Sequence, residues 1–168
     1  MKKIVLVING NGGIGKDSLL IFAQKYIALR NISSVTPIKE IAAVGGYDDN
    51  KKDEKSRQLI SDLKKLFIAY NDLPLNYVRK EYSKFLKSTK DEFLCVHIRE
   101  PKEIDRLKKY INCKTLFIVR DGSKKWNNES DDNASKYKYD YTFENNKPLA
   151  EGGKDFVELL KTIAKAEK

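Results

Sequence analysis

The stretch Lys3-Ile4-Val5-Leu6-Val7-Ile8-Asn9-Gly10-Asn11-Gly12-Gly13-Ile14-Gly15-Lys16-Asp17-Ser18 decides the fold of this chain. Its first part, residues 3–9, is a continuous apolar run, typical of a strand that is buried on both faces of a parallel sheet. Glycines follow at once, and apolar residues then recur at helical spacing. This spacing predicts a helix over residues 16–30, so that a strand, a glycine-rich loop and a helix follow one another.

The glycine-rich loop, residues 10–18, matches two binding motifs. Read as G-x-G-x-x-G, it is a dinucleotide-binding loop, which requires an acidic residue about 20 positions later, at the end of the next strand. Residues 33–36 occupy that region, and the first acidic residue after the loop's own Asp17 is Glu40. Read as G-x-x-x-x-G-K, it is a phosphate loop, and the lysine that this motif requires is Lys16. The sequence therefore favours the phosphate loop.

A phosphate loop binds its ligand mainly through the backbone. Glycines allow successive N–H groups to point at one anion, and the N-terminus of the following helix adds the positive end of its dipole. The expected phosphate-binding residues are Gly10, Asn11, Gly12, Gly13, Ile14, Gly15, Lys16, Asp17 and Ser18. We expect the Lys16 ammonium to reach the β- and γ-phosphates of ATP. The Mg²⁺ that accompanies ATP is expected to contact Ser18, Asp17 or both, in part through water.

Strands and helices alternate along the rest of the chain. Further strands are expected over residues 32–35, 92–98, 115–120 and 139–144, with helices between them and a closing helix near residues 156–163. The pattern predicts one α/β domain over residues 1–168, a three-layer fold with a five-stranded parallel sheet and helices on both faces. Two polar segments, near residues 45–55 and 121–138, are expected to be mobile. The second segment has no apolar period and is interpreted as a loop or flap that carries Lys124, Lys125 and Trp126.

The composition indicates a soluble globular protein, with 40% hydrophobic and 34% charged residues. The apolar runs have the length of strands and no signal-peptide pattern precedes them, so we expect a cytoplasmic protein without a membrane partner. Cys95 and Cys113 lack metal-ligand spacing and are expected to be reduced, mostly buried thiols. The formal charge of +9 is spread without a block of like charges. This charge allows anionic partners, and its scattered distribution does not favour a nucleic acid. With the phosphate loop, small-molecule nucleotides are the expected partners.

Two arginines lie at the carboxyl ends of predicted strands. Arg99 follows the third strand and Arg120 ends the fourth. In an open parallel sheet, the carboxyl ends of the strands surround the ligand crevice. A guanidinium group binds phosphate through two parallel hydrogen bonds. We therefore expect both arginines beside the phosphate loop.

The run Gly15-Lys16-Asp17-Ser18 after a buried strand resembles the loop of P-loop nucleoside and deoxynucleoside monophosphate kinases. This family includes a branch of bacteriophage deoxynucleoside monophosphate kinases and animal phosphomevalonate kinases. Further segments are similar to the family in the same order: residues 37–40, 56–59, 97–99, 119–122 and 143–146. They correspond to an acceptor-site segment, an arginine-bearing helix, two strand ends that carry arginine, and a strand–Asn segment near the base. The resemblance spans most of the chain.

The resemblance implies that the γ-phosphoryl group of ATP is transferred, with Mg²⁺, to a nucleoside monophosphate, with a deoxynucleotide as one alternative. The residues that it assigns are Lys16, Arg99 and Arg120 for charge stabilisation, Lys39, Arg57 and Arg99 for the acceptor, and Asn145 and Asn146 for the base. His97 stands where the family carries an aspartate that helps to hold magnesium. Either Asp17 or Glu100 would then take that part, or the protein would bind magnesium more weakly.

Several alternatives stay open at this point. His97 is either a base or a hydrogen-bonded residue at the end of a strand. The chain is alternatively a kinase of another small phosphorylated metabolite, because a phosphate loop does not distinguish acceptors. A second alternative is a regulatory nucleotide-binding protein without transferase activity, and a basic nucleic-acid-binding module ranks third.

Overall fold

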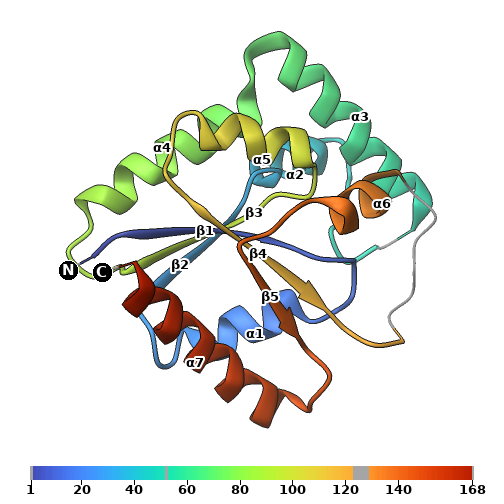
Figure 1. Ribbon diagram of the computed structural model, residues 1–168. Helices are drawn as coiled ribbons and strands as arrows, with labels where there is room; N and C mark the ends of the chain where they lie inside the picture. The colour runs from blue at the N-terminus through green and yellow to red at the C-terminus, as the bar shows by residue number, and fades with distance from the viewer. Residues whose placement is uncertain (1, 52, 123–128, 168) are drawn as a thin grey trace.

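The computed structural model describes residues 2–51, 53–122 and 129–167. Its strands are β1 (Ile4–Asn9), β2 (Leu29–Ser33), β3 (Phe93–His97), β4 (Lys114–Val119) and β5 (Tyr141–Glu144). All of them are parallel and form one sheet in the order β2-β3-β1-β4-β5 (Figure 1). The predicted five-stranded parallel sheet is therefore confirmed, and β1, which leads into the glycine-rich loop, lies at its centre.

Helices cover both faces of the sheet (Figure 1). They are α1 (Lys16–Ala23), α2 (Thr36–Val44), α3 (Glu54–Asn71), α4 (Leu73–Lys87), α5 (Pro101–Lys108), α6 (Glu129–Lys136) and α7 (Leu149–Ala166). Helices α1 and α7 pack on one face, whereas α4 and α5 pack on the other. This three-layer arrangement is the one that the alternation of strands and helices predicts.

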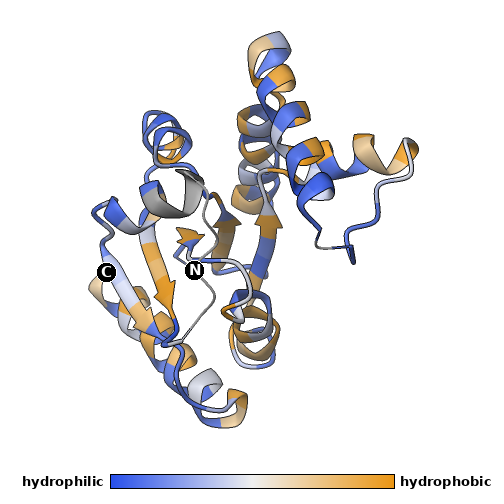
Figure 2. Cartoon of the chain, turned by 90° about the vertical axis from the view of Figure 1, so that its right-hand side faces the viewer, coloured by the Kyte–Doolittle hydropathy of each residue, from blue (hydrophilic) through white to orange (hydrophobic). Residues whose placement is uncertain are grey.

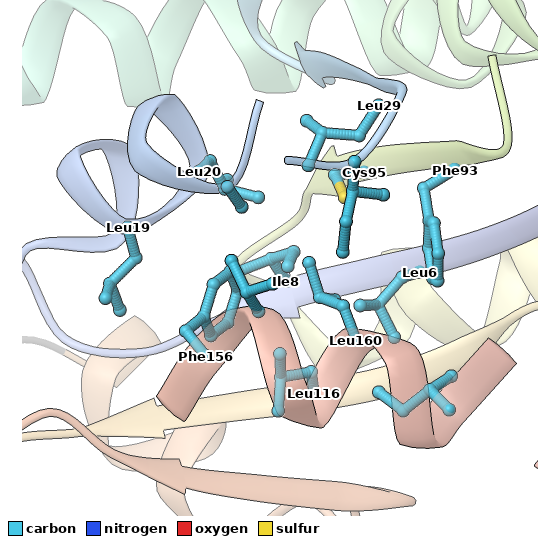
Figure 3. Packing of buried hydrophobic residues seen from close by; sticks show 14 of the residues in the cluster. Leu6, Ile8, Leu19, Leu20, Leu29, Phe93, Cys95, Leu116, Phe156 and Leu160 are labelled. Atoms are coloured by element: carbon cyan, nitrogen blue, oxygen red, sulfur yellow. The ribbon is translucent and has the colours of Figure 1, made fainter. Parts of the chain in front are cut away.

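The alternation of side chains along β1 supplies both cores. Leu6 and Ile8 point toward α1 and α7, where they meet Phe156 and Leu160 (Figure 3). Val5 and Val7 point to the opposite face, toward α4 and α5. Because successive side chains of a strand alternate between faces, a strand covered on both sides must be apolar throughout. All six residues of β1 are buried.

Helix α1 is shorter than predicted, and β2 begins earlier. The helix ends at Ala23 rather than near Arg30, and β2 already includes Leu29. The backbone N–H groups of Tyr26 and Ile27 both donate to the carbonyl of Ala23, which turns the chain out of the helix. Leu29 then pairs with Phe93 of β3. Pairing with β3 as the edge strand of the sheet therefore determines the structure of this segment, although the helical spacing of apolar residues continues through Tyr26 and Ile27.

The segment 121–138 is not wholly a loop, as it was predicted to be, because α6 lies within it. Ala134 is the residue that this helix buries in its described part. Ala134 is the only apolar residue in the sequence of this short helix, which therefore has no apolar stripe that periodicity could reveal. Lys124, Lys125 and Trp126 lie outside the described residues, and the mobility of the two polar segments stays a prediction.

Helix α3 stands apart from the core. It packs against α2 and α4, and none of its residues is buried. In Figure 2 the strands at the centre are mostly hydrophobic, whereas the surrounding helices carry both hydrophilic and hydrophobic residues. Helix α3 therefore forms an outer wall beside the sheet rather than part of the packed core.

Within the described residues, no helix has the length and apolar character that crossing a membrane would require.

Candidate phosphate-binding site

The loop between β1 and α1 adopts a conformation that requires glycine. Gly10 has a φ of 146°, and a Cβ atom there would lie 2.4 Å from the carbonyl oxygen of Ile118. Gly15 has a φ of 85° and immediately precedes α1. A side chain at Gly15 would meet the Asn145 amide at 2.9 Å. The glycines of the motif thus allow the backbone to curl closely around the N-terminus of α1, which is the geometry of an anion-binding loop.

The Lys16 side chain lies back over this loop. Its ammonium nitrogen donates to the carbonyl oxygens of Gly10, at 2.6 Å, and Asn11, at 2.7 Å. Lys16 is the first residue of α1, so its charge adds to the positive end of the helix dipole. The loop therefore concentrates positive potential where the sequence predicts the donor phosphates.

A cavity of about 750 Å³ opens beside the loop. Its walls come from the loop, the ends of β1, β2 and β3, helices α2, α3 and α5, and the segment between α2 and α3. The residues predicted to bind phosphates or the acceptor that line this cavity are Gly10, Gly12, Gly13, Lys16, Lys39, Arg57 and Arg99. The structure thus brings together cations from four separate segments of the chain.

The cavity also contains an ion pair that no pattern in the sequence predicts. The Lys39 ammonium lies 2.7 Å from the carboxylate of Asp49. The Tyr47 hydroxyl donates to the same carboxylate at 2.9 Å. Burial and the hydrogen bond to Asp49 raise the pKa of Tyr47 to about 12, so this phenol stays protonated. Asp49 and Tyr47 lie in the polar segment near residues 45–55, which carries no motif that would identify them.

A second ion pair joins two walls of the cavity. Lys64 of α3 lies 3.0 Å from Glu103 of α5, and both side chains are only 15% exposed. It ties the otherwise unburied helix α3 to the body of the domain. No sequence signal predicts this pair, because both residues look like ordinary charges on helix surfaces.

His97 lies at the end of β3 and lines the same cavity. Its Nε2 atom lies 2.9 Å from the Oδ1 atom of Asn31 and 3.6 Å from a carboxylate oxygen of Asp17. Burial lowers the pKa of His97 to about 4, and the nearby Asp17 carboxylate only partly opposes this effect. His97 is therefore a neutral imidazole at physiological pH, in keeping with the hydrogen-bonded interpretation. A neutral Nε2–H donates to Asn31.

The other predicted site residues lie outside the cavity lining. Arg120 follows β4 and is exposed. The Asn145 side chain is buried and donates to the carbonyl of Ile14, which supports the phosphate loop from behind. Asn146 donates to the carboxylate of Asp121 and accepts from the Asp121 backbone N–H. The assignment of Arg120 to the transferring charge, and of both asparagines to a base, stays a prediction.

The oxygen atoms next to the loop suit a magnesium ion. Asp17 and Ser18 are consecutive exposed residues in the first turn of α1, and the Asp17 side chain is 83% exposed. Among the described residues, no group of three His, Cys, Asp or Glu side chains could hold a metal alone. Mg²⁺ bound with nucleotides commonly takes one or two protein oxygens and completes its shell with water and phosphate. Asp17 and Ser18 fit that role.

Several solved structures share this fold. TT1252 from Thermus thermophilus is 12% identical, with a TM-score of 0.55 and 98% of each chain covered. Shikimate kinase from Bacteroides thetaiotaomicron is 14% identical, with a TM-score of 0.51 over 96% of this chain and 98% of that one. Dephospho-CoA kinase from Campylobacter jejuni is 13% identical, with a TM-score of 0.53 and 98% of each chain covered. The chain thus has a P-loop kinase-like fold. It matches no protein-family model and no curated protein.

Proposed function

We propose that this protein transfers the γ-phosphoryl group of ATP to a nucleoside monophosphate, with a deoxynucleotide as one alternative. The observation that carries the proposal is the convergence of Lys39, Arg57 and Arg99 on a cavity that opens on the phosphate loop. A loop for the donor phosphates and a separate group of cations for an anionic acceptor are the two binding sites that a kinase needs side by side.

Phosphoryl transfer requires positioning and charge stabilisation rather than covalent chemistry by the protein. The loop amides and Lys16 bind the donor phosphates. Arg99 stabilises charge on the transferring group, and Arg57 and Lys39 hold the acceptor so that its oxygen is in line with the γ-phosphorus. Mg²⁺ held by Asp17 and Ser18 would neutralise charge on the β- and γ-phosphates.

The size of the cavity fits a small-molecule acceptor. Ligand pockets typically measure about 300–1,000 Å³, and the cavity measures about 750 Å³. Its lining includes the cations Lys16, Lys39, Arg57 and Arg99, so we expect an anionic acceptor. Asp49 already neutralises Lys39, so an acceptor phosphate that reaches Lys39 competes with that carboxylate.

One observation favours a second candidate, a kinase of another small phosphorylated metabolite. Tyr47 is the only Phe, Tyr or Trp among the described residues that line the cavity. A purine or pyrimidine gains much of its binding energy by stacking on such rings. The scarcity of stacking partners suits an acceptor that carries a phosphate but no base.

The test is an ADP-release assay with Mg-ATP and a panel of nucleoside monophosphates, deoxynucleoside monophosphates and small phosphorylated metabolites. We expect one class of acceptor to support turnover, and Lys16→Ala to abolish it. Lys161→Ala is the matched control, because it removes a lysine from a surface ion pair on α7. Binding of ATP without transfer to any acceptor would overturn the proposal in favour of a regulatory nucleotide-binding protein.

A further inference from the structure

Asn9 is the last residue of β1, and its side chain has no part in the proposed binding of donor or acceptor. It is 2% exposed, the polar end of an otherwise apolar strand. Its Oδ1 atom accepts from the Gly10 N–H at 2.8 Å. Its Nδ2 atom donates to the carbonyl oxygen of Arg99 and to the Tyr139 hydroxyl, at 2.8 Å each. The Asn9 amide is therefore hydrogen-bonded both to the backbone of Gly10, the first residue of the phosphate loop, and to the backbone of Arg99, an arginine of the cavity.

The hydrogen-bond network allows one orientation of this amide. The Gly10 N–H can only donate and the Arg99 carbonyl can only accept, so the oxygen of Asn9 must face Gly10 and the nitrogen must face Arg99. The second N–H of Asn9 meets the oxygen of Tyr139. Tyr139 in turn donates its own proton to the carbonyl of Ala134, at 2.9 Å. Every donor and acceptor in the chain of bonds has a partner, and aspartate, with no N–H, could not replace Asn9.

The Tyr139 ring is held independently of its hydroxyl group. It stacks on Phe117 of β4 with 4.7 Å between ring centroids, and Phe117 pairs with Asn9 across the sheet. The hydroxyl group is thereby presented to Asn9 from a fixed direction. Because Ala134 belongs to α6, the bonds form a continuous connection from α6 to the phosphate loop and to Arg99.

We propose that Asn9 is a positioning residue that sets the distance between the phosphate loop and Arg99, and that Tyr139 couples this setting to α6. The inference rests on the proposed function, because it assigns Gly10 to the donor and Arg99 to the transferring phosphoryl group. A fixed relation between the two is what in-line transfer requires, since small displacements of positioning groups lower the rate steeply.

The variant that tests the inference is Tyr139→Phe, which removes one hydroxyl and keeps the stacked ring. Tyr137→Phe is the matched control. It lies two residues away, contacts the Tyr139 ring edge-on and loses a hydrogen bond of 2.7 Å to Asp105. Each variant removes one hydroxyl group. Tyr137→Phe loses the bond to Asp105, whereas Tyr139→Phe loses the bond to Ala134 and also the bond from Asn9. Asn9→Ala and the double variant complete a double-mutant cycle.

ATP affinity is measured by calorimetry, and kcat and KM are measured with the acceptor found by the panel, well below the unfolding temperature. We expect Tyr139→Phe to weaken ATP binding by about 5-fold, the usual effect of one lost hydrogen bond, and to lower kcat further. Tyr137→Phe is expected to lower the unfolding temperature without changing either quantity. In the cycle, the effects of Asn9→Ala and Tyr139→Phe on ATP affinity should not add.

Equal effects of Tyr139→Phe and Tyr137→Phe on ATP affinity and kcat would overturn the inference, as would additivity in the cycle. If Asn9→Ala does not fold, the comparison of the two tyrosine variants decides alone. The proposed function fails separately, when the wild-type chain binds ATP but transfers to no acceptor. The ATP affinities of the variants would then still report whether the Tyr139 hydroxyl supports the loop.

Discussion

The ammonium group of Lys39 lies 2.7 Å from the carboxylate of Asp49, inside the cavity that we assign to the acceptor. The pair joins α2 to the segment that follows it, and the Tyr47 hydroxyl donates to the same Oδ1 atom of Asp49. The two side chains are 37% and 63% exposed, so water screens their attraction. Exposed pairs of this kind contribute at most about 1 kcal/mol. An anionic acceptor can therefore displace Asp49 from Lys39 at small cost.

Asp49→Asn should strengthen the binding of an anionic acceptor. The substitution keeps the size of the side chain and removes the charge that competes for Lys39. We expect the KM for the acceptor to fall by about 2- to 5-fold, in line with the energy of an exposed ion pair, while kcat changes little. The control is Asp48→Asn. The carboxylate of Asp48 lies in the same segment but accepts hydrogen bonds from Asn50. A rise in KM would show instead that Asp49 itself binds the acceptor.

Arg99→Lys should impair transfer although it conserves charge. A lysine ammonium cannot form the paired hydrogen bonds of a guanidinium group with phosphate. Losing a charge-assisted hydrogen bond costs about 1.5–3 kcal/mol, so kcat/KM should fall by about 10- to 100-fold. Arg79→Lys serves as the control, because Arg79 is exposed on α4 and lies over the Tyr110 ring. If both variants retain full activity, Arg99 does not contact the phosphoryl group.

Gly10→Ala and Gly13→Ala separate steric demand from backbone preference. Both glycines have positive φ angles, but a Cβ atom at Gly10 meets the Ile118 carbonyl at 2.4 Å, whereas nothing lies within 4 Å of one at Gly13. Gly13→Ala should cost about 1–2 kcal/mol of unfolding free energy. Gly10→Ala should cost clearly more and abolish ATP binding. Thermal unfolding and calorimetry measure the two effects, and equal losses would contradict the close approach to Ile118.

The sequence predicts the fold and the glycine-dependent conformation of the loop well because both depend on local patterns. A strand buried on both faces needs an uninterrupted apolar run, as in β1, and the loop needs glycines where φ is positive, as at Gly10 and Gly15. The predicted end of α1 was wrong because the pairing of Leu29 with β3 outweighs the helical spacing of the apolar residues before it. Helix α6 was missed because it buries Ala134 without an apolar stripe.

The acceptor side is less accessible to sequence reasoning. Arg99 is predicted from its place after a strand, and Lys39 and Arg57 from the resemblance. The structure places all three in the lining of one cavity, and their role in binding an acceptor stays a prediction. The ion pairs of the cavity depend on the tertiary structure and could not be predicted. The pair of Lys64 and Glu103, for example, joins two helices that carry many similar charges. Asn9 did leave a signal in the sequence, as a polar residue that ends an apolar strand just before a glycine loop.

The pH dependence of stability should reveal the buried thiols. Cys95 and Cys113 are free and buried, and burial raises the pKa of their thiols to about 12 and about 11, from the ordinary value of 9.0. The folded protein therefore keeps protons that the unfolded chain releases above pH 9. By linkage, the stability due to neutral thiols is complete below pH 9 and is lost as pH rises from about 9 toward 12.

A thiol-labelling experiment checks this expectation. Iodoacetamide should leave Cys95 unmodified at pH 8 in the folded protein and should modify it rapidly in denaturant, because only the exposed thiolate reacts. The unfolding free energy of the wild type should decline between pH 8 and 10 more than that of Cys95→Ala. The alanine variant also loses packing in the core, so the comparison uses the slope with pH and not the absolute stability. Equal slopes, or fast labelling of Cys95 in the folded protein, would show that this thiol ionises as freely in the fold as in the unfolded chain.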